Sequence, residues 1–133
     1  MTIALFCILL AALMPLVCAG LSKWRGFQVS HRDGGYDNRN PRDWIVRQEG
    51  FAKWAHGAQE NSWEAFPFFA AAVIVSHMLG VIGTLPNALA VAFVALRGVY
   101  VLLYVTGRHK WRSRVWALAL AVNIAIFLLP LTR

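Results

Sequence analysis

The chain has 133 residues, of which 59% are hydrophobic and only 14% are charged, and its net charge is +7. A water-soluble domain carries more charge on its surface, so the composition excludes an ordinary soluble domain and predicts a single all-α integral membrane domain. The positive charge does not indicate nucleic acid as a partner, because it gathers in the segments that flank apolar runs.

Four stretches are long enough to cross a bilayer, which takes about 20 apolar residues. We expect spans at roughly residues 3–21, 62–82, 85–105 and 115–131, with cytoplasmic loops at 22–43 and 107–114. Seven basic residues fall between Lys23 and Lys53 and four between Arg108 and Arg114, whereas the connection near residues 81–87 has none. This alternation follows the positive-inside rule and predicts that both termini lie outside the cytoplasm.

The first run lacks a basic leader and is longer than the apolar part of a signal peptide, so we interpret it as a true span. Its two cysteines, Cys7 and Cys18, lie about 16 Å apart along one helix and are too far apart for a disulfide. After the polar loop, Asn40-Pro41 marks the start of the next helix. From Asp43 we expect this helix to continue unbroken into the second span.

Candidate binding residues stand on the second and third spans. Asn61 and Glu64 are one helical turn apart, and Glu64 leads into a run without charge, where a carboxylate needs a partner or a function. Arg97, Tyr100 and Tyr104 form one stripe on the third span. Together these groups suit a small zwitterionic, polyanionic ligand. The alternative is a structural ion pair between Glu64 and Arg97.

Other polar residues give weaker signals. The four histidines, His31, His56, His77 and His109, are scattered along the chain and predict no metal site. Asn123 is the polar residue inside the fourth span, and we expect it to form a hydrogen bond between helices rather than a functional site.

These residues resemble the motifs of the MAPEG family, the membrane-associated proteins of eicosanoid and glutathione metabolism. Asn61-x-x-Glu64-Ala-Phe-Pro67-x-Phe69 resembles the family's Asn-x-x-Glu motif, and Arg97-x-x-Tyr100-x-x-x-Tyr104 resembles its third helix. The loop 36–42 is similar to one in uncharacterised bacterial members. The resemblance covers essentially the whole chain.

The resemblance implies a homotrimer of four-helix subunits in a bacterial inner membrane, in contact with lipid. Glutathione would be the co-substrate, held between neighbouring subunits near the cytoplasmic face. The residues implied to bind it are Gln59, Asn61, Glu64, Arg97, Tyr100 and Tyr104. Arg112 or Arg114 would be the catalytic residue, because a nearby cation favours the reactive thiolate.

The implied activity is that of a glutathione-dependent membrane transferase or peroxidase acting on hydrophobic electrophiles or lipid hydroperoxides. The chain departs from the family's pattern at two positions. Gly57 stands where family enzymes often have an arginine, and Ala65 stands where several have a tyrosine, and both changes should weaken the binding of glutathione. The family also includes a non-catalytic member. The alternative is therefore a membrane scaffold that binds a lipid or a partner protein.

Overall fold

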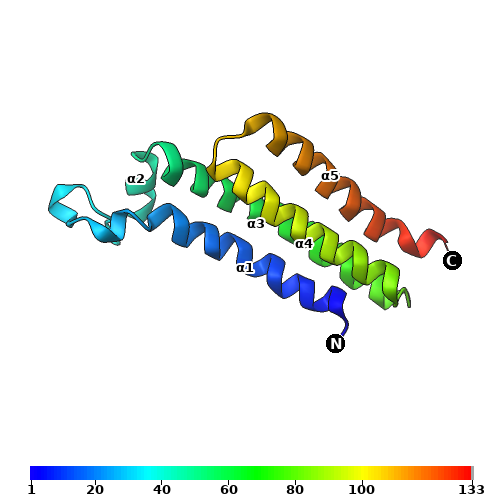
Figure 1. Ribbon diagram of the computed structural model, residues 1–133. Helices are drawn as coiled ribbons and strands as arrows, with labels where there is room; N and C mark the ends of the chain where they lie inside the picture. Colours follow the sequence, from blue (N-terminus) through cyan, green and yellow to red (C-terminus); the bar gives the residue numbers. More distant parts are fainter. Residues whose placement is uncertain (133) are drawn as a thin grey trace.

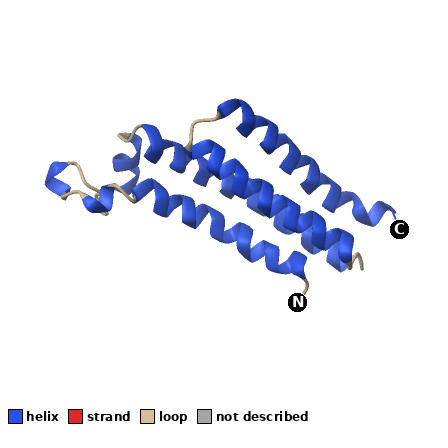
Figure 2. Ribbon diagram, viewed as in Figure 1, coloured by secondary structure: helices blue, strands red, loops and turns tan. Residues whose placement is uncertain are grey.

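A computed structural model of the chain describes residues 1–132, whose regular secondary structure is all helical, with no strand among them (Figures 1 and 2). The all-α prediction is confirmed for this part of the chain. The long helices α1, α3, α4 and α5 lie alongside one another, and both ends of the described chain are opposite the segment between α1 and α3 (Figure 1). The helices are α1 (Ile3–Lys23), α2 (Pro41–Val46), α3 (Gly50–Met78), α4 (Thr84–Val105) and α5 (His109–Leu128), and the 3₁₀ turns are η1 (Gly26–Gln28), η2 (His31–Asp33) and η3 (Leu129–Thr132).

Within residues 1–132, three helical segments are long and apolar enough to cross a membrane: Ile3–Lys23, Thr84–Val105 and His109–Thr132. They agree with the first, third and fourth predicted spans. The second predicted span lies in α3, whose first half is polar, and α3 is not one of the three. Its crossing of the membrane therefore stays a prediction.

One expectation about helix boundaries needs correction. The helix beginning at Pro41 does not continue into the second span, because α2 ends at Val46 and α3 begins at Gly50. Gly50 has a φ of 58°, a left-handed conformation that glycine adopts without steric cost. At the other connection, α5 begins at His109, so part of the expected cytoplasmic loop 107–114 is helical, and its place outside the membrane stays a prediction.

The first helix packs closely on its neighbours through small residues. Its buried positions are spaced three or four apart and comprise Ala4, Cys7, Ala11, Pro15, Cys18 and Ser22. Such a stripe lets helix backbones approach, which is how membrane helices associate. Both cysteines are free and buried, as expected. Across the core, Phe69 of α3 stacks on Phe93 of α4 with ring centroids 4.1 Å apart.

Side chains at the N-terminal end hold α1 in register with α3 and α4. Thr2 caps α1 by accepting a hydrogen bond from the Leu5 N–H at 3.3 Å. Its Oγ1 is also 2.6 Å from Nε2 of His77. The Ala4 N–H donates to Oδ1 of Asn87 at 2.9 Å. Two of the N–H groups that a helix start leaves unpaired thus have side-chain partners.

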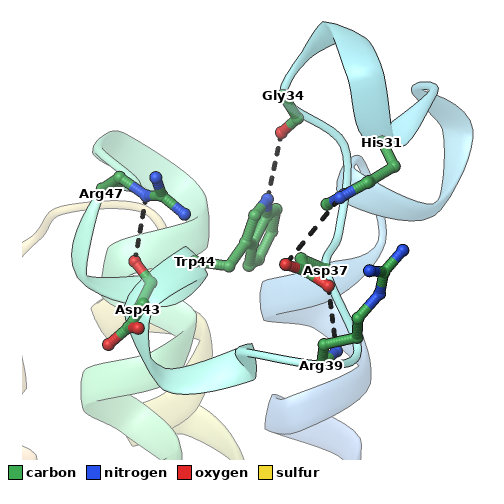
Figure 3. A network of polar contacts seen from close by, with 7 residues as sticks. All are labelled: His31, Gly34, Asp37, Arg39, Asp43, Trp44 and Arg47. Carbon is green, nitrogen blue, oxygen red and sulfur yellow. Dashed lines mark hydrogen bonds and ion pairs between the residues drawn. The ribbon is translucent and has the colours of Figure 1, made fainter.

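At the opposite end, the segment 24–49 folds around the indole of Trp44. Trp44 Nε1 donates to the carbonyl of Gly34 at 3.1 Å (Figure 3). The ring of Tyr36 meets the Trp44 ring edge to face at 5.3 Å, and Phe27 meets Tyr36 at 4.9 Å. Gly26 lies against the indole, where an added Cβ would overlap the ring. An aromatic core therefore orders this loop.

Polar contacts close the same loop (Figure 3). Asp37 Oδ1 accepts the backbone N–H of Arg39 at 2.9 Å, and its Oδ2 lies 3.9 Å from Nε2 of His31. The backbone N–H of Arg39 is the main cause that lowers the pKa of Asp37, and nearby positive charge adds to it. Arg47 Nε donates to the carbonyl of Asp43 at 3.2 Å.

Candidate functional site

The Asn61 side chain connects a carboxylate to a guanidinium. On α3, Asn61 Nδ2 donates to Oε2 of Glu64 at 3.1 Å, which places both residues on one helix face as predicted. From α4, Arg97 Nη1 donates to Oδ1 of Asn61 at 3.0 Å. An amide suits this position because it offers both a donor and an acceptor.

Arg97 is buried, with only 3% of its surface exposed. Its Nη2 donates to Oγ of Ser62 at 3.3 Å, and that hydroxyl donates to the Ala58 carbonyl at 2.7 Å. The guanidinium lies over the ring of Tyr100, with Cζ 4.2 Å from the centroid. Neutral groups and an aromatic face therefore surround this cation, and no ion pair within 4.0 Å involves it among residues 1–132.

Tyr100 and Tyr104, which we call the tyrosine stripe, follow Arg97 toward the C-terminal end of α4. The rings of Tyr100 and Tyr104 meet edge to face at 5.7 Å, and the Arg112 guanidinium of α5 lies over the Tyr104 ring at 4.2 Å. Tyr104 also lies against Gly57 of α3, where an added Cβ would overlap its hydroxyl. We call the set Asn61, Ser62, Glu64, Arg97, Tyr100, Tyr104 and Arg112 the Arg97 cluster.

Glu64 is the exposed member of the Arg97 cluster. It does not form the ion pair with Arg97 that was the structural alternative, because Asn61 stands between them. An ionisable residue beside apolar membrane helices is a candidate for function rather than for packing alone. Glu64 also lines a cleft of about 160 Å³ between α3, α4 and α5.

Two of the residues implied by the resemblance lie outside the cluster. Gln59 is half-buried on α3, and no hydrogen bond within residues 1–132 joins it to the others. Arg114 is exposed and lies over the ring of Trp111 at 4.9 Å. The other predicted residues come together: Asn61, Glu64, Arg97, Tyr100, Tyr104 and Arg112.

The structure adds Ser62, which the sequence analysis did not select. It is buried and accepts a hydrogen bond from Arg97. A serine in a helix commonly bonds the carbonyl four residues earlier, so its sequence position alone gave no signal of contact with another helix. Asn123, expected to bond between helices, instead lines the cleft and has an unpaired Oδ1 among the described residues.

Comparisons with known proteins identify the family of the chain. No curated protein and no solved structure matches it. The family model described as MAPEG family matches residues 3–132. With this match over nearly the whole chain, three helices long and apolar enough to cross a bilayer, and the clustered polar residues of α3 and α4, the chain is an integral membrane protein that belongs to the MAPEG family.

Proposed function

We propose that the protein is a glutathione-dependent membrane transferase or peroxidase that acts on hydrophobic electrophiles or lipid hydroperoxides. One observation carries this proposal. Glu64 is exposed and unneutralised, and it is joined through Asn61 to the buried cation of Arg97. Glutathione offers the complementary groups, an ammonium for Glu64 and carboxylates for a guanidinium.

The proposed site is completed at the other end of the tyrosine stripe. The ring of Tyr104 holds the guanidinium of Arg112 in one orientation. A cation at this place favours the thiolate form of a bound thiol, and the thiolate is the nucleophile. In our proposal Glu64 and Arg97 bind glutathione, Tyr100 and Tyr104 line its binding site, and Arg112 stabilises its thiolate. Gln59 and Arg114 are weaker candidates for these roles.

The proposal includes an assembly and an orientation. Four spans, with α3 as the second, form a four-helix subunit, and three subunits form a homotrimer in a bacterial inner membrane. Both termini face away from the cytoplasm, and glutathione lies between neighbouring subunits. The exposure of Glu64 on a single chain supports a site at such an interface, as do the basic segments at one end of the molecule.

One observation favours a second candidate, a non-catalytic scaffold that binds a lipid or a partner protein. Tyr104 fills the space beside Gly57, so an arginine at position 57 would displace it. The packing of α3 on α4 therefore leaves no room for the arginine that several family enzymes carry at this position. A contact expected to hold glutathione is missing, and this favours the scaffold.

Ultraviolet absorbance of a bound thiolate distinguishes the two candidates. The enzyme predicts a thiolate band when glutathione is added to the wild type and a weaker band in Glu64→Ala. Glu60→Ala is the matched control, because Glu60 is an exposed acid one turn earlier that faces His56. Glutathione binding without a thiolate band would support the scaffold. The absence of binding would mean that glutathione is not a ligand of this protein.

A further inference from the structure

A hollow lies in the segment 24–49, and none of its lining residues belongs to the Arg97 cluster. It measures about 410 Å³, a volume within the range of about 300–1,000 Å³ that is common for ligand pockets. Its lining comes from η2, from the glycines that follow η2 and from the C-terminal end of α2. The polar side chains of this loop hollow are His31, Arg32, Asp37, Arg47 and Gln48.

The two arginines of the loop hollow have unused donors. Arg32 is exposed and takes part in no hydrogen bond or ion pair among residues 1–132. Arg47 donates from Nε to the Asp43 carbonyl at 3.2 Å, which leaves its two terminal nitrogens without a partner in the same range. Figure 3 shows Arg47 and His31 directed toward one another across the Trp44 indole. Free guanidinium groups bind the oxygens of a phosphate in bidentate fashion.

The single carboxylate of the loop hollow already has partners. Asp37 accepts the Arg39 N–H through Oδ1 at 2.9 Å, and its Oδ2 lies 3.9 Å from Nε2 of His31. The side chain of Asp43 points away from the hollow (Figure 3). Two guanidinium groups therefore face one carboxylate, and this excess of positive charge favours an anion over a cation.

Hydrogen bonds around the Trp44 indole hold the loop hollow in shape. Trp44 Nε1 donates to the Gly34 carbonyl at 3.1 Å, and Gln48 Nε2 donates to the Trp44 carbonyl at 3.0 Å. The Gly35 N–H donates to the Ser30 carbonyl at 2.9 Å. A ligand that enters such a preformed site has little ordering of the protein to offset. Among residues 1–132, no hydrogen bond or ion pair joins this segment to the Arg97 cluster.

We propose that the loop hollow binds a phosphate group through Arg32 and Arg47. The phosphate belongs either to a soluble phosphate ester or to the head group of an anionic lipid, because the segment follows directly after α1, a helix long and apolar enough to cross a membrane. This inference goes beyond the proposed function, since it concerns a second ligand and residues outside the Arg97 cluster.

Calorimetric titration of inorganic phosphate into the full-length protein tests this inference, in maltoside micelles without glutathione and against chloride at equal ionic strength. We expect Arg32→Gln and Arg47→Gln each to weaken phosphate binding about tenfold, the loss expected for a charged hydrogen bond. Arg42→Gln is the matched control, because Arg42 is an exposed arginine of α2 that does not line the hollow. Glu64→Gln should bind phosphate like the wild type, which separates this site from the glutathione site.

A second titration identifies the source of the phosphate. It compares micelles that carry phosphatidic acid with micelles that carry phosphatidylcholine. Phosphatidic acid that binds more tightly than inorganic phosphate, with the same dependence on Arg32 and Arg47, would support a lipid head group. Inorganic phosphate that binds at least as tightly would support a soluble ester. Binding of neither probe, or equal losses in the variants of Arg32, Arg42 and Arg47, would overturn the inference.

Chemical protection in the wild type gives a test that does not depend on the folding of variants. Phenylglyoxal modifies accessible guanidinium groups, and mass spectrometry locates the modified arginines. Bound phosphate should slow the modification of Arg32 and Arg47 and leave that of Arg42 unchanged. Protection of none of these arginines, or of all three alike, would contradict a phosphate site in the loop hollow.

Discussion

Adding one methyl group at Gly57 tests how α3 and α4 pack beside the Arg97 cluster. The Cβ of Gly57→Ala would overlap the Tyr104 hydroxyl and come within 2.8 Å of its Cζ. Tyr104 must then move, and Arg112, which lies over its ring, loses its support. Gly98 of α4 is the matched control, since a Cβ there meets nothing within 4 Å.

The two substitutions should change stability in opposite directions. Alanine in a helix interior is favoured over glycine by about 1 kcal/mol, so Gly98→Ala should raise the free energy of unfolding by about that amount. Overpacking costs about 1–3 kcal/mol. At Gly57 an overpacking cost of about 2 kcal/mol exceeds the helix gain of about 1 kcal/mol, so we expect the free energy of unfolding to fall by about 1 kcal/mol.

Reversible unfolding in mixed micelles measures both changes, and a double-mutant cycle identifies the contact. In a Tyr104→Ala background the clash is absent, so Gly57→Ala should become stabilising, as at Gly98. The coupling between the two sites should be about 2 kcal/mol, within the range for contacting residues. If Gly57→Ala stabilises the otherwise wild-type protein as Gly98→Ala does, the packing of Tyr104 on Gly57 is refuted.

Three further predictions concern the cluster and the loop. Asn61→Leu leaves buried Arg97 with one acceptor fewer, so unfolding free energy should fall by about 1.5–3 kcal/mol, measured in the same micelles; an unchanged value would contradict the hydrogen bond. Arg112→Ala should remove the thiolate band of bound glutathione while Arg114→Ala keeps it, because only the first guanidinium lies over the tyrosine stripe; equal effects would refute this assignment. The hydrogen bond from the Arg39 backbone N–H lowers the pKa of Asp37 in the folded protein. This hydrogen bond therefore stabilises the loop fully above the ordinary carboxyl pKa of about 4. The stabilisation is lost as the pH falls through the lower pKa that Asp37 has in the folded protein. Amide exchange corrected for intrinsic rates should show this loss of protection, and a protection that is constant from pH 7 to pH 2 would contradict it.

Local periodicity was enough to predict which residues share a helix face. Three-residue spacing placed Asn61 beside Glu64, and the stripe of Arg97, Tyr100 and Tyr104 faces α3 as one set. Apolar length likewise predicted three helices that are long and apolar enough to cross a membrane. These features depend on neighbours within one helix, which the sequence displays directly.

Contacts between helices were beyond the reach of the sequence. Whether Glu64 meets Arg97 directly depends on the relative height and rotation of α3 and α4, and the structure inserts Asn61 between them. The role of Ser62 and the space filled beside Gly57 depend on the same packing. The break before Gly50 was missed because helix propensity penalises a glycine only modestly, while its left-handed φ appears only in the folded chain.

Calorimetric titration of glutathione into the purified protein tests the central claim most directly. Glu64→Gln keeps an acceptor for Asn61 and removes the charge, and Glu60→Gln removes an exposed charge one turn away. The account predicts that Glu64→Gln weakens glutathione binding about tenfold or more, as expected for a charged hydrogen bond, while Glu60→Gln binds like the wild type. Equal affinity of the wild type and Glu64→Gln would contradict the account.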